Sequence, residues 1–366
     1  MRWCDQHQRI NHLTKRSMYT LGIDLHKRAS TWSLINESHT EIWKTSVVSH
    51  PDHFSKTLPT VPVAPQDLQV AIEPVAGWRW ATQLLEEHGC DVHMAHPRKV
   101  KLIAESKQKT DALDAYQLAR LLASGYFPEA RRVPDTTYDL RLLLRTRSHI
   151  VRLRTSVLNR IHGIATTTGL HTIPGGNPCS VVGKQTLLAS ESILRELHLL
   201  ADALTERIKA LDHTCEQSVA QFPDTVYLRS MPGVGIITAL TVVAEVGDFC
   251  DFASAKKLAS YAGLVPKQRS SGTRVRYGGI THEGSPYLRT ILVEAAMRIH
   301  PKGAPELYQV VSNLTPRCGA KKARVALARK LLSIMWTLVA TQTTYNPSLV
   351  SSATTILSNP DTGAGA

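Results

Sequence analysis

The chain has 366 residues and 43% of them are hydrophobic, which suits two or three globular domains with ordinary buried cores. Lys and Arg number 43 against 30 Asp and Glu, and this excess of positive charge favours a polyanionic partner such as DNA or RNA. No apolar run reaches the roughly 20 residues that span a bilayer. We therefore expect a cytoplasmic protein without a membrane partner. The six cysteines are scattered singly, which argues against a zinc finger.

The N-terminal part of the chain has a strand-rich pattern after a polar extension. Short β-prone runs separated by polar turns predict an antiparallel meander over residues 19–24, 30–36 and 41–48. A strand, an amphipathic helix and another strand then predict a βαβ unit over residues 68–74, 79–89 and 91–96. This order of elements is that of a ribonuclease-H-like α/β domain. A helix over 111–125 follows it.

Two long helices are expected in the middle of the chain. The first is a leucine-rich helix at 138–162, and the second has apolar residues at alternating steps of three and four from Ile193 to Val219. Together they predict an antiparallel coiled-coil arm, and an ordinary helical hairpin fits the pattern equally well. The arginines of the first helix greatly outnumber its acids. A solvated helix face is one explanation, but this imbalance favours contact with nucleic acid through residues that include Arg141, Arg145 and Arg152.

The C-terminal part is expected to be mainly helical, over residues 228–248, 285–300 and 321–339. Its MPGVG turn, with Gly233 and Gly235, resembles a helix-hairpin-helix element, in which backbone N–H groups at a helix start bind a phosphate. A plain turn between helices is the alternative.

The segment PKQRSSGTRVRYGG is interpreted as a loop of basic residues around two serines. Basic side chains position phosphates and glycines allow close backbone approach. The loop by itself therefore predicts contact with a nucleic-acid backbone through Lys267, Arg269, Arg274 and Arg276.

Four carboxylates form the candidate metal site. Asp24 and Glu73 end or nearly end apolar strands, and burying a carboxylate there is costly unless it has a partner. Asp111 and Asp114 lie one helical turn apart and share a helix face, although an acid at a helix start also complements the helix dipole. Carboxylate oxygens select Mg²⁺ or Mn²⁺, which can activate a nucleophile on a phosphodiester.

Five motifs occur in the order of a known family. They are GIDLHK (22–27), AIEPVAGW (71–78), KTDALDAYQLA (109–119), MPGVGIITA (231–239) and YAGLVPKQRSSGTRVRYGGITHEGSPYLR (261–289). Together they resemble the IS one-ten family of insertion-sequence transposases, which includes relatives of the Piv and MooV DNA invertases. The resemblance covers about residues 18–340.

The resemblance implies a RuvC-like domain with a DEDD tetrad, a coiled-coil region and a transposase domain with a catalytic serine. The matching tetrad is Asp24, Glu73, Asp111 and Asp114, and the matching serine is Ser271 rather than its neighbour Ser270. The expected divisions of the chain are an N-terminal extension (1–17), a RuvC-like domain (18–133), a coiled-coil region (134–222), a serine transposase domain (223–345) and a flexible tail (346–366).

The expected function is Mg²⁺-dependent DNA strand exchange through a phosphoserine link. The resemblance also implies a structured guide RNA that pairs with donor and target DNA, and a homodimer or homotetramer, since two strands on two duplexes are cut. The nearest alternative is a hydrolytic nuclease or Holliday-junction resolvase, in which Ser271 only binds phosphate. A non-enzymatic nucleic-acid-binding regulator is the alternative of another class.

Overall fold

The computed structural model describes residues 19–97, 99–100, 111–169, 177–183, 192–271 and 274–348. The chain forms two compact units that divide between Arg132 and Val133. The expected N-terminal extension and most of the expected tail lie outside the described residues. Within the described ranges, no helix combines the length and the apolar character needed to cross a membrane.

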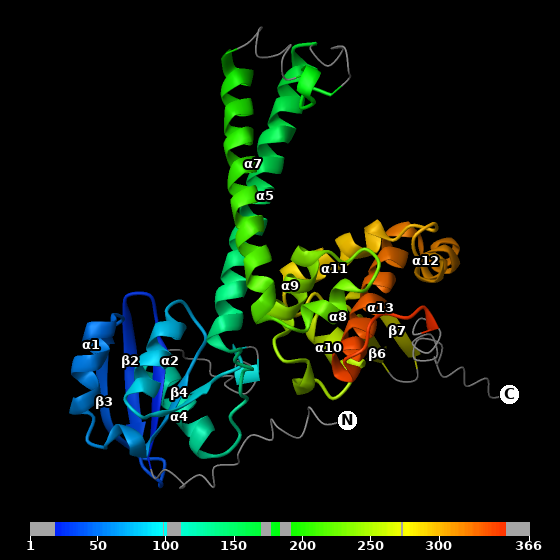
Figure 1. Ribbon diagram of the computed structural model, residues 1–366. Coiled ribbons are helices and arrows are strands. Elements are labelled where there is room, and N and C mark those ends of the chain that lie inside the picture. Colours follow the sequence, from blue (N-terminus) through cyan, green and yellow to red (C-terminus); the bar gives the residue numbers. More distant parts are fainter. Residues whose placement is uncertain are drawn as a thin grey trace, which may run out of the picture. The chain divides into compact units, whose positions relative to one another are not determined.

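The N-terminal unit is built on a five-stranded mixed sheet (Figure 1). Its strands are β1 (Tyr19–Leu25), β2 (Ala29–Ile35), β3 (Glu41–Val48), β4 (Leu68–Ile72) and β5 (Asp91–Met94). The spatial order is β3-β2-β1-β4-β5, with β1, β2 and β3 antiparallel and with β4 and β5 parallel to β1. The predicted meander followed by a βαβ unit is therefore confirmed.

Helices cover both faces of this sheet. They are α1 (Pro51–Thr57), α2 (Trp78–Glu87) and α4 (Asp111–Ala123), and the 3₁₀ turns Leu58–Thr60 and Pro65–Asp67 connect α1 to β4. Because side chains alternate along a strand, β1 places Leu21 and Ile23 on the face that packs against Phe54 of α1 and Leu85 of α2. On the other face, Leu118 of α4 packs against the sheet.

Two long helices begin the C-terminal unit. Helices α5 (Asp135–Thr167) and α7 (Ser192–Ser218) lie side by side and run antiparallel (Figure 1). Apolar side chains such as Ile161 and Leu194 join the two helices far from the rest of the unit, whereas Leu140 and Cys215 belong to its main core. Helix α5 extends beyond the predicted 138–162 at both ends, whereas α7 matches its prediction to within one residue. The classification of the pair as a coiled coil stays a prediction.

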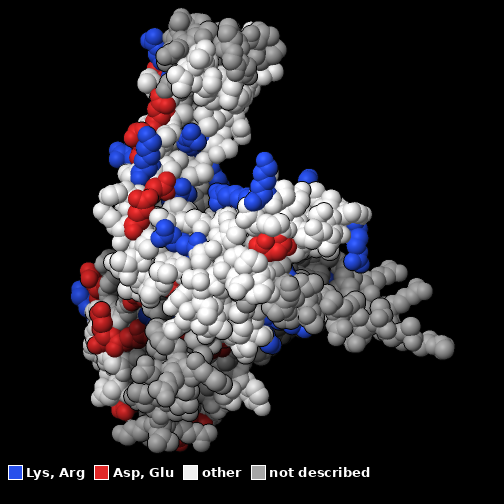
Figure 2. All heavy atoms as spheres, turned by 45° about the vertical axis from the view of Figure 1, so that its right-hand side comes forward, with Lys and Arg blue, Asp and Glu red and all other residues white. Residues whose placement is uncertain are grey.

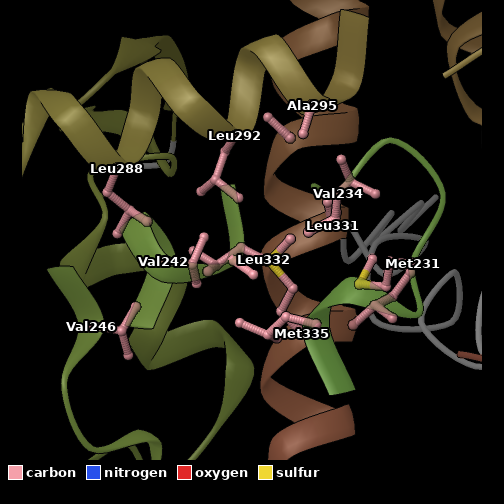
Figure 3. Close-up of a cluster of buried hydrophobic side chains, with 14 of the residues drawn as sticks. Met231, Val234, Val242, Val246, Leu288, Leu292, Ala295, Leu331, Leu332 and Met335 are labelled. Carbon is pink, nitrogen blue, oxygen red and sulfur yellow. The ribbon is translucent and has the colours of Figure 1, made fainter. Parts of the chain in front are cut away.

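The rest of the unit is a helical bundle around one apolar core. Its helices are α8 (Thr225–Arg229), α9 (Ile236–Val246), α10 (Ala255–Tyr261), α11 (Pro286–Arg298), α12 (Pro305–Cys318) and α13 (Ala320–Thr341), with 3₁₀ turns at Val219–Gln221 and Phe249–Asp251. Figure 3 shows Val242 of α9, Leu292 of α11 and Leu332 of α13 meeting at the centre of this core. Helix α9 is buried from Thr238 to Val246.

One element of the C-terminal unit differs from its prediction. The segment interpreted as a loop is an antiparallel hairpin of β6 (Pro266–Ser271) and β7 (Arg274–Ile280), so that interpretation was wrong. The reason lies in the composition: β6 reads PKQRSS and contains none of the β-branched or aromatic residues that announce a strand. Its pairing with β7 comes from backbone hydrogen bonds, which the side-chain pattern does not reveal.

Candidate active site

Two acids of the candidate metal site stand at the same end of neighbouring strands. Ile23 of β1 pairs in parallel register with Ile72 of β4, so the next residues, Asp24 and Glu73, are adjacent across the sheet. Asp24 is buried, with 6% of its surface exposed, and Glu73 is half-buried directly after β4. Both acids were assigned to one site from the sequence, but this register was not predicted.

Helix α4 covers the face of the sheet that carries Asp24. A Cβ atom at Gly22 would lie 1.9 Å from the Ala115 carbonyl oxygen, so α4 rests directly on β1 at this glycine. Because Gly22 and Asp24 are two residues apart on one strand, both belong to the face under α4. Any larger residue at position 22 would push the helix away from the sheet.

The other two acids lie in the first turn of α4. Asp111 is the first residue of the helix and Asp114 is half-buried one turn later. The side chain of Asp111 is outside the described part of the structure. Among the described side chains, no three His, Cys, Asp or Glu residues lie close enough together to hold a metal ion. The completed tetrad therefore stays a prediction.

A histidine that the sequence analysis did not single out contacts the first of these acids. His26 Nε2 lies 3.0 Å from Asp24 Oδ2, and about half of the histidine side chain is exposed. The motif GIDLHK contains this residue two positions after Asp24, so the spacing was visible in the sequence. Only the turn that follows β1 brings its ring back to the carboxylate.

The candidate nucleophile lies at the far end of the hairpin. Ser271, the last residue of β6, pairs with Arg274, and Ser270 pairs with Val275. Lys267 is exposed nearer the start of the hairpin. The side chains of Arg269, Arg274 and Arg276 fall outside the described ones, so their predicted phosphate contacts stay predictions.

The MPGVG turn is largely a packing element. Its Met231 and Val234 side chains are buried in the core of the C-terminal unit (Figure 3). Gly233 has a φ of +77° and a Cβ there would lie 3.0 Å from the carbonyl oxygen of Ala295 in α11. Gly235 is exposed with open space beside it, at the uncapped start of α9. Gly235 is thus the glycine of the pair that leaves a helix start accessible to a phosphate.

Two of the arginines predicted to contact nucleic acid form hydrogen bonds to other residues of the protein. Arg141 of α5 donates from Nε and Nη2 to the Ala244 carbonyl oxygen at 3.0 and 2.8 Å. Arg145 donates from Nε and Nη2 to the two carboxylate oxygens of Glu245 at 2.8 and 2.9 Å. Burial lowers the pKa of Arg145. Its hydrogen bonds to Glu245 and the negative charge of that residue raise the pKa by more, so that it lies above its usual value. These two arginines join α5 to α9.

The remaining arginines of α5 have mixed surroundings. Arg152 lies over the ring of Tyr287 at 5.5 Å, beside a pocket of about 230 Å³ between α5, α9 and α11. Arg147 pairs with Asp212 of α7. Figure 2 shows acidic side chains interspersed with basic ones along the helix pair. Arg145, Arg147 and Arg152 all border this pocket. Among the described contacts, Arg145 and Arg147 form ion pairs and Arg152 does not.

The Glu245 carboxylate gives a testable stability effect. Replacing Glu245 with Gln should destabilise the protein by about 1–3 kcal/mol, because the buried carboxylate loses the charge that holds the half-buried Arg145 through two hydrogen bonds. The matched change Glu206→Gln removes an exposed pair with Lys209 and should cost less than about 1 kcal/mol. Thermal and urea unfolding of both variants measure the difference. Equal stability of the two variants would contradict a structural role for Glu245.

Comparison with known proteins identifies relatives of both parts of the chain. The model of the "Transposase IS116/IS110/IS902 family" matches residues 226–309, and a DEDD "Transposase" model of the IS110 type matches residues 21–169. The transposase for insertion sequence element IS1111A of Coxiella burnetii is 33% identical over 70% of this chain and 73% of its own length. The chain belongs to the IS110/IS116/IS902 family of transposases.

Other relatives extend the comparison. A "Probable family 20 transposase" of Pseudomonas aeruginosa is 29% identical over 76% of this chain and 86% of its own length. The pilin gene-inverting protein of Moraxella lacunata is 26% identical over 72% of this chain and 77% of its own length. The family expected from the five motifs is therefore confirmed, and with it the expected kinship to DNA-inverting proteins.

Proposed function

We propose that this family member is the transposase of an insertion sequence, and that it cleaves and exchanges DNA strands through a covalent phosphoserine link. The observation that carries the proposal is the placement of Asp24 and Glu73, adjacent at the same end of two parallel strands. The order β3-β2-β1-β4-β5, with helices on both faces, also supports assigning the N-terminal unit to the ribonuclease-H-like class.

The residues of the N-terminal unit suit a divalent cation. Asp24 and Glu73 offer carboxylate oxygens on the face that α4 covers, and α4 itself carries Asp111 and Asp114. These four acids would hold Mg²⁺ or Mn²⁺, both of which prefer oxygen ligands. Such an ion supplies charge neutralisation at the phosphodiester and makes a hydroxyl more readily deprotonated. His26 contacts Asp24 and so restrains its carboxylate.

In the proposed reaction, Ser271 provides the nucleophile. Its Oγ loses a proton and forms a bond to phosphorus, while the bond from phosphorus to the 3′-oxygen breaks and that oxygen takes up a proton. The phosphoserine ester keeps the energy of the broken phosphodiester. A 3′-hydroxyl of another strand then attacks phosphorus, which restores a phosphodiester and releases the serine hydroxyl. No external energy source is needed, because each step exchanges one phosphate ester for another.

The partners proposed are donor DNA, target DNA and a structured guide RNA. The family supports the first two, and the excess of 13 positive charges favours polyanions in general. Two strands on two duplexes have to be cut, which calls for a homodimer or homotetramer. Arg152, Gly235 and the basic residues of the β6–β7 hairpin are the proposed backbone contacts.

Reconstitution tests these partners together. Protein purified from a host that also expresses the DNA flanking its gene should carry an enriched, element-derived RNA. With donor DNA, target DNA and Mg²⁺, this complex should produce joined strands. RNA affinity should fall steeply with salt, by about 10³-fold or more between 50 and 200 mM if six or more phosphates are contacted.

Two controls make this experiment decisive. Removing the RNA with ribonuclease before the DNA is added should abolish joining, and adding the same RNA back should restore it. Joining that is unaffected by ribonuclease would contradict RNA guidance while leaving strand exchange intact. A preparation that only cuts DNA, with or without RNA, would favour a hydrolytic nuclease.

A further inference from the structure

The hairpin that carries Ser271 is attached to its unit at one end. Pro266 pairs with Ile280 where the hairpin leaves the unit, and Ser271 pairs with Arg274 at its other end. Between these two residue pairs β6 advances by five residues, which is about 17 Å at the spacing of a β-strand. Ile280 packs against the core. The other residues of the two strands whose burial is described are exposed, namely Pro266, Lys267, Gln268, Gly278 and Gly279. A two-stranded hairpin is marginally stable in water by itself, so its orientation depends on its base.

At that base, the two segments that flank the hairpin touch through their backbones. A Cβ atom at Gly263 would lie 1.9 Å from the Glu283 carbonyl oxygen, and one at Gly284 would lie 1.9 Å from the Tyr261 carbonyl oxygen. Both glycines also have positive φ angles, of +68° and +77°. Only glycine permits this approach, because a side chain would meet backbone atoms at both positions.

Besides the burial of Ala262 and Leu264 in the core, an arginine ties these segments to a core helix. Arg289, in the first turns of α11, donates from Nη1 to the carbonyl oxygens of Glu283, Gly284 and Ala262 at 2.8, 3.0 and 3.2 Å. Ala262 precedes the hairpin and the other two follow it. The preceding residue on α11, Leu288, is fully buried in the core. The guanidinium group therefore joins both ends of the hairpin to a helix that the core holds in place.

We propose that Arg289 is the positioning residue of the serine hairpin: it fixes the angle at which β6 and β7 leave the core and thereby places Ser271. This rests on the proposed function of Ser271 as the nucleophile. A rotation of about 5° at the base moves the end of a lever about 17 Å long by roughly 1.5 Å. A misplacement of about 1 Å can slow a reaction by about 100-fold, even when the changed residue is remote from the reacting atoms.

The test compares three variants of the full chain: Arg289→Ala, Arg289→Lys and the control Arg298→Ala. Arg298 is exposed on the same helix and makes only a 4.0 Å ion pair with Glu294 among its described contacts. Arg289→Ala should slow formation of the protein–DNA adduct by about 100-fold, with DNA affinity within about twofold of the original. Free guanidinium ion at millimolar concentration, or the Lys variant, should restore part of the rate. Arg298→Ala should change neither quantity.

Hydrogen–deuterium exchange separates positioning from general destabilisation. Arg289→Ala should raise exchange in peptides from 266–280 and leave the peptides of α9 protected. Unchanged exchange in the hairpin, or an equal rise in α9, would overturn the proposal. If the original protein forms no adduct through Ser271, the proposed function fails, and the exchange comparison still decides whether Arg289 holds the hairpin.

Discussion

Replacing Asp24 with Asn should reduce DNA cleavage by on the order of 10⁴-fold, the scale seen when a member of a catalytic set is removed. The change keeps the shape of the side chain and removes its charge at a position that is 6% exposed beside Glu73. The proposed cation would lose a ligand, and its affinity would fall. Asp114→Asn, on the helix that covers this face, should have an effect in the same direction.

Single-turnover cleavage of end-labelled DNA over a range of Mg²⁺ concentrations measures this effect. The matched control is Glu87→Gln, which removes an acid from the exposed end of α2 and should leave cleavage within about twofold, as expected of a surface change. Thermal unfolding and nucleic-acid binding check that the variants fold. Undiminished Mg²⁺-dependent cleavage by folded Asp24→Asn protein would refute the assignment of the metal site.

The second large effect concerns the serine. Ser271→Ala should abolish both the covalent adduct and strand exchange, with a loss on the order of 10⁴-fold or more, because no other group of the chain is proposed to take over the attack on phosphorus. DNA binding should persist, since the hairpin backbone and its basic residues remain. Denaturing electrophoresis of labelled DNA detects the adduct, and sequencing of joined products detects exchange.

The neighbouring serine supplies the control for this change. Ser270 pairs with Val275 one step before the end of β6, and Ser270→Ala should retain adduct and exchange within about tenfold, the scale of a secondary contact. Equal losses in both variants would point to damage of the hairpin rather than loss of a nucleophile. Exchange that survives in Ser271→Ala would assign the attack to water or to another residue.

Periodicity revealed most of the regular elements. The strands of the N-terminal unit and the long helices carry apolar residues at clear intervals of two or of three and four, so their existence was predictable. The tight turn after β1 and the register between β1 and β4 were not, because both depend on contacts between segments far apart in sequence. The contact of His26 with Asp24 and the register that pairs the ends of β1 and β4 therefore appear only in three dimensions, although the sequence had already placed Asp24 and Glu73 in one site.

Charge patterns were the least informative part of the sequence. The arginines of α5 suggested a nucleic-acid surface, yet Arg141 and Arg145 bind the end of α9. A signal for this existed: Glu245 is the single charged residue in a helix that is otherwise apolar or small, and a buried acid requires a partner. Arg289 gave no comparable signal, because its partners are backbone carbonyl groups, whose positions depend on the fold.

The central claim is tested most directly by finding which residue becomes linked to DNA. The unaltered protein should be incubated with donor DNA, target DNA, Mg²⁺ and its RNA, then denatured and digested with a protease and a nuclease. Mass spectrometry should find a nucleotide remnant attached through phosphate to Ser271. Strand exchange without any protein–DNA adduct, or a remnant attached to a different residue, would contradict the proposed mechanism.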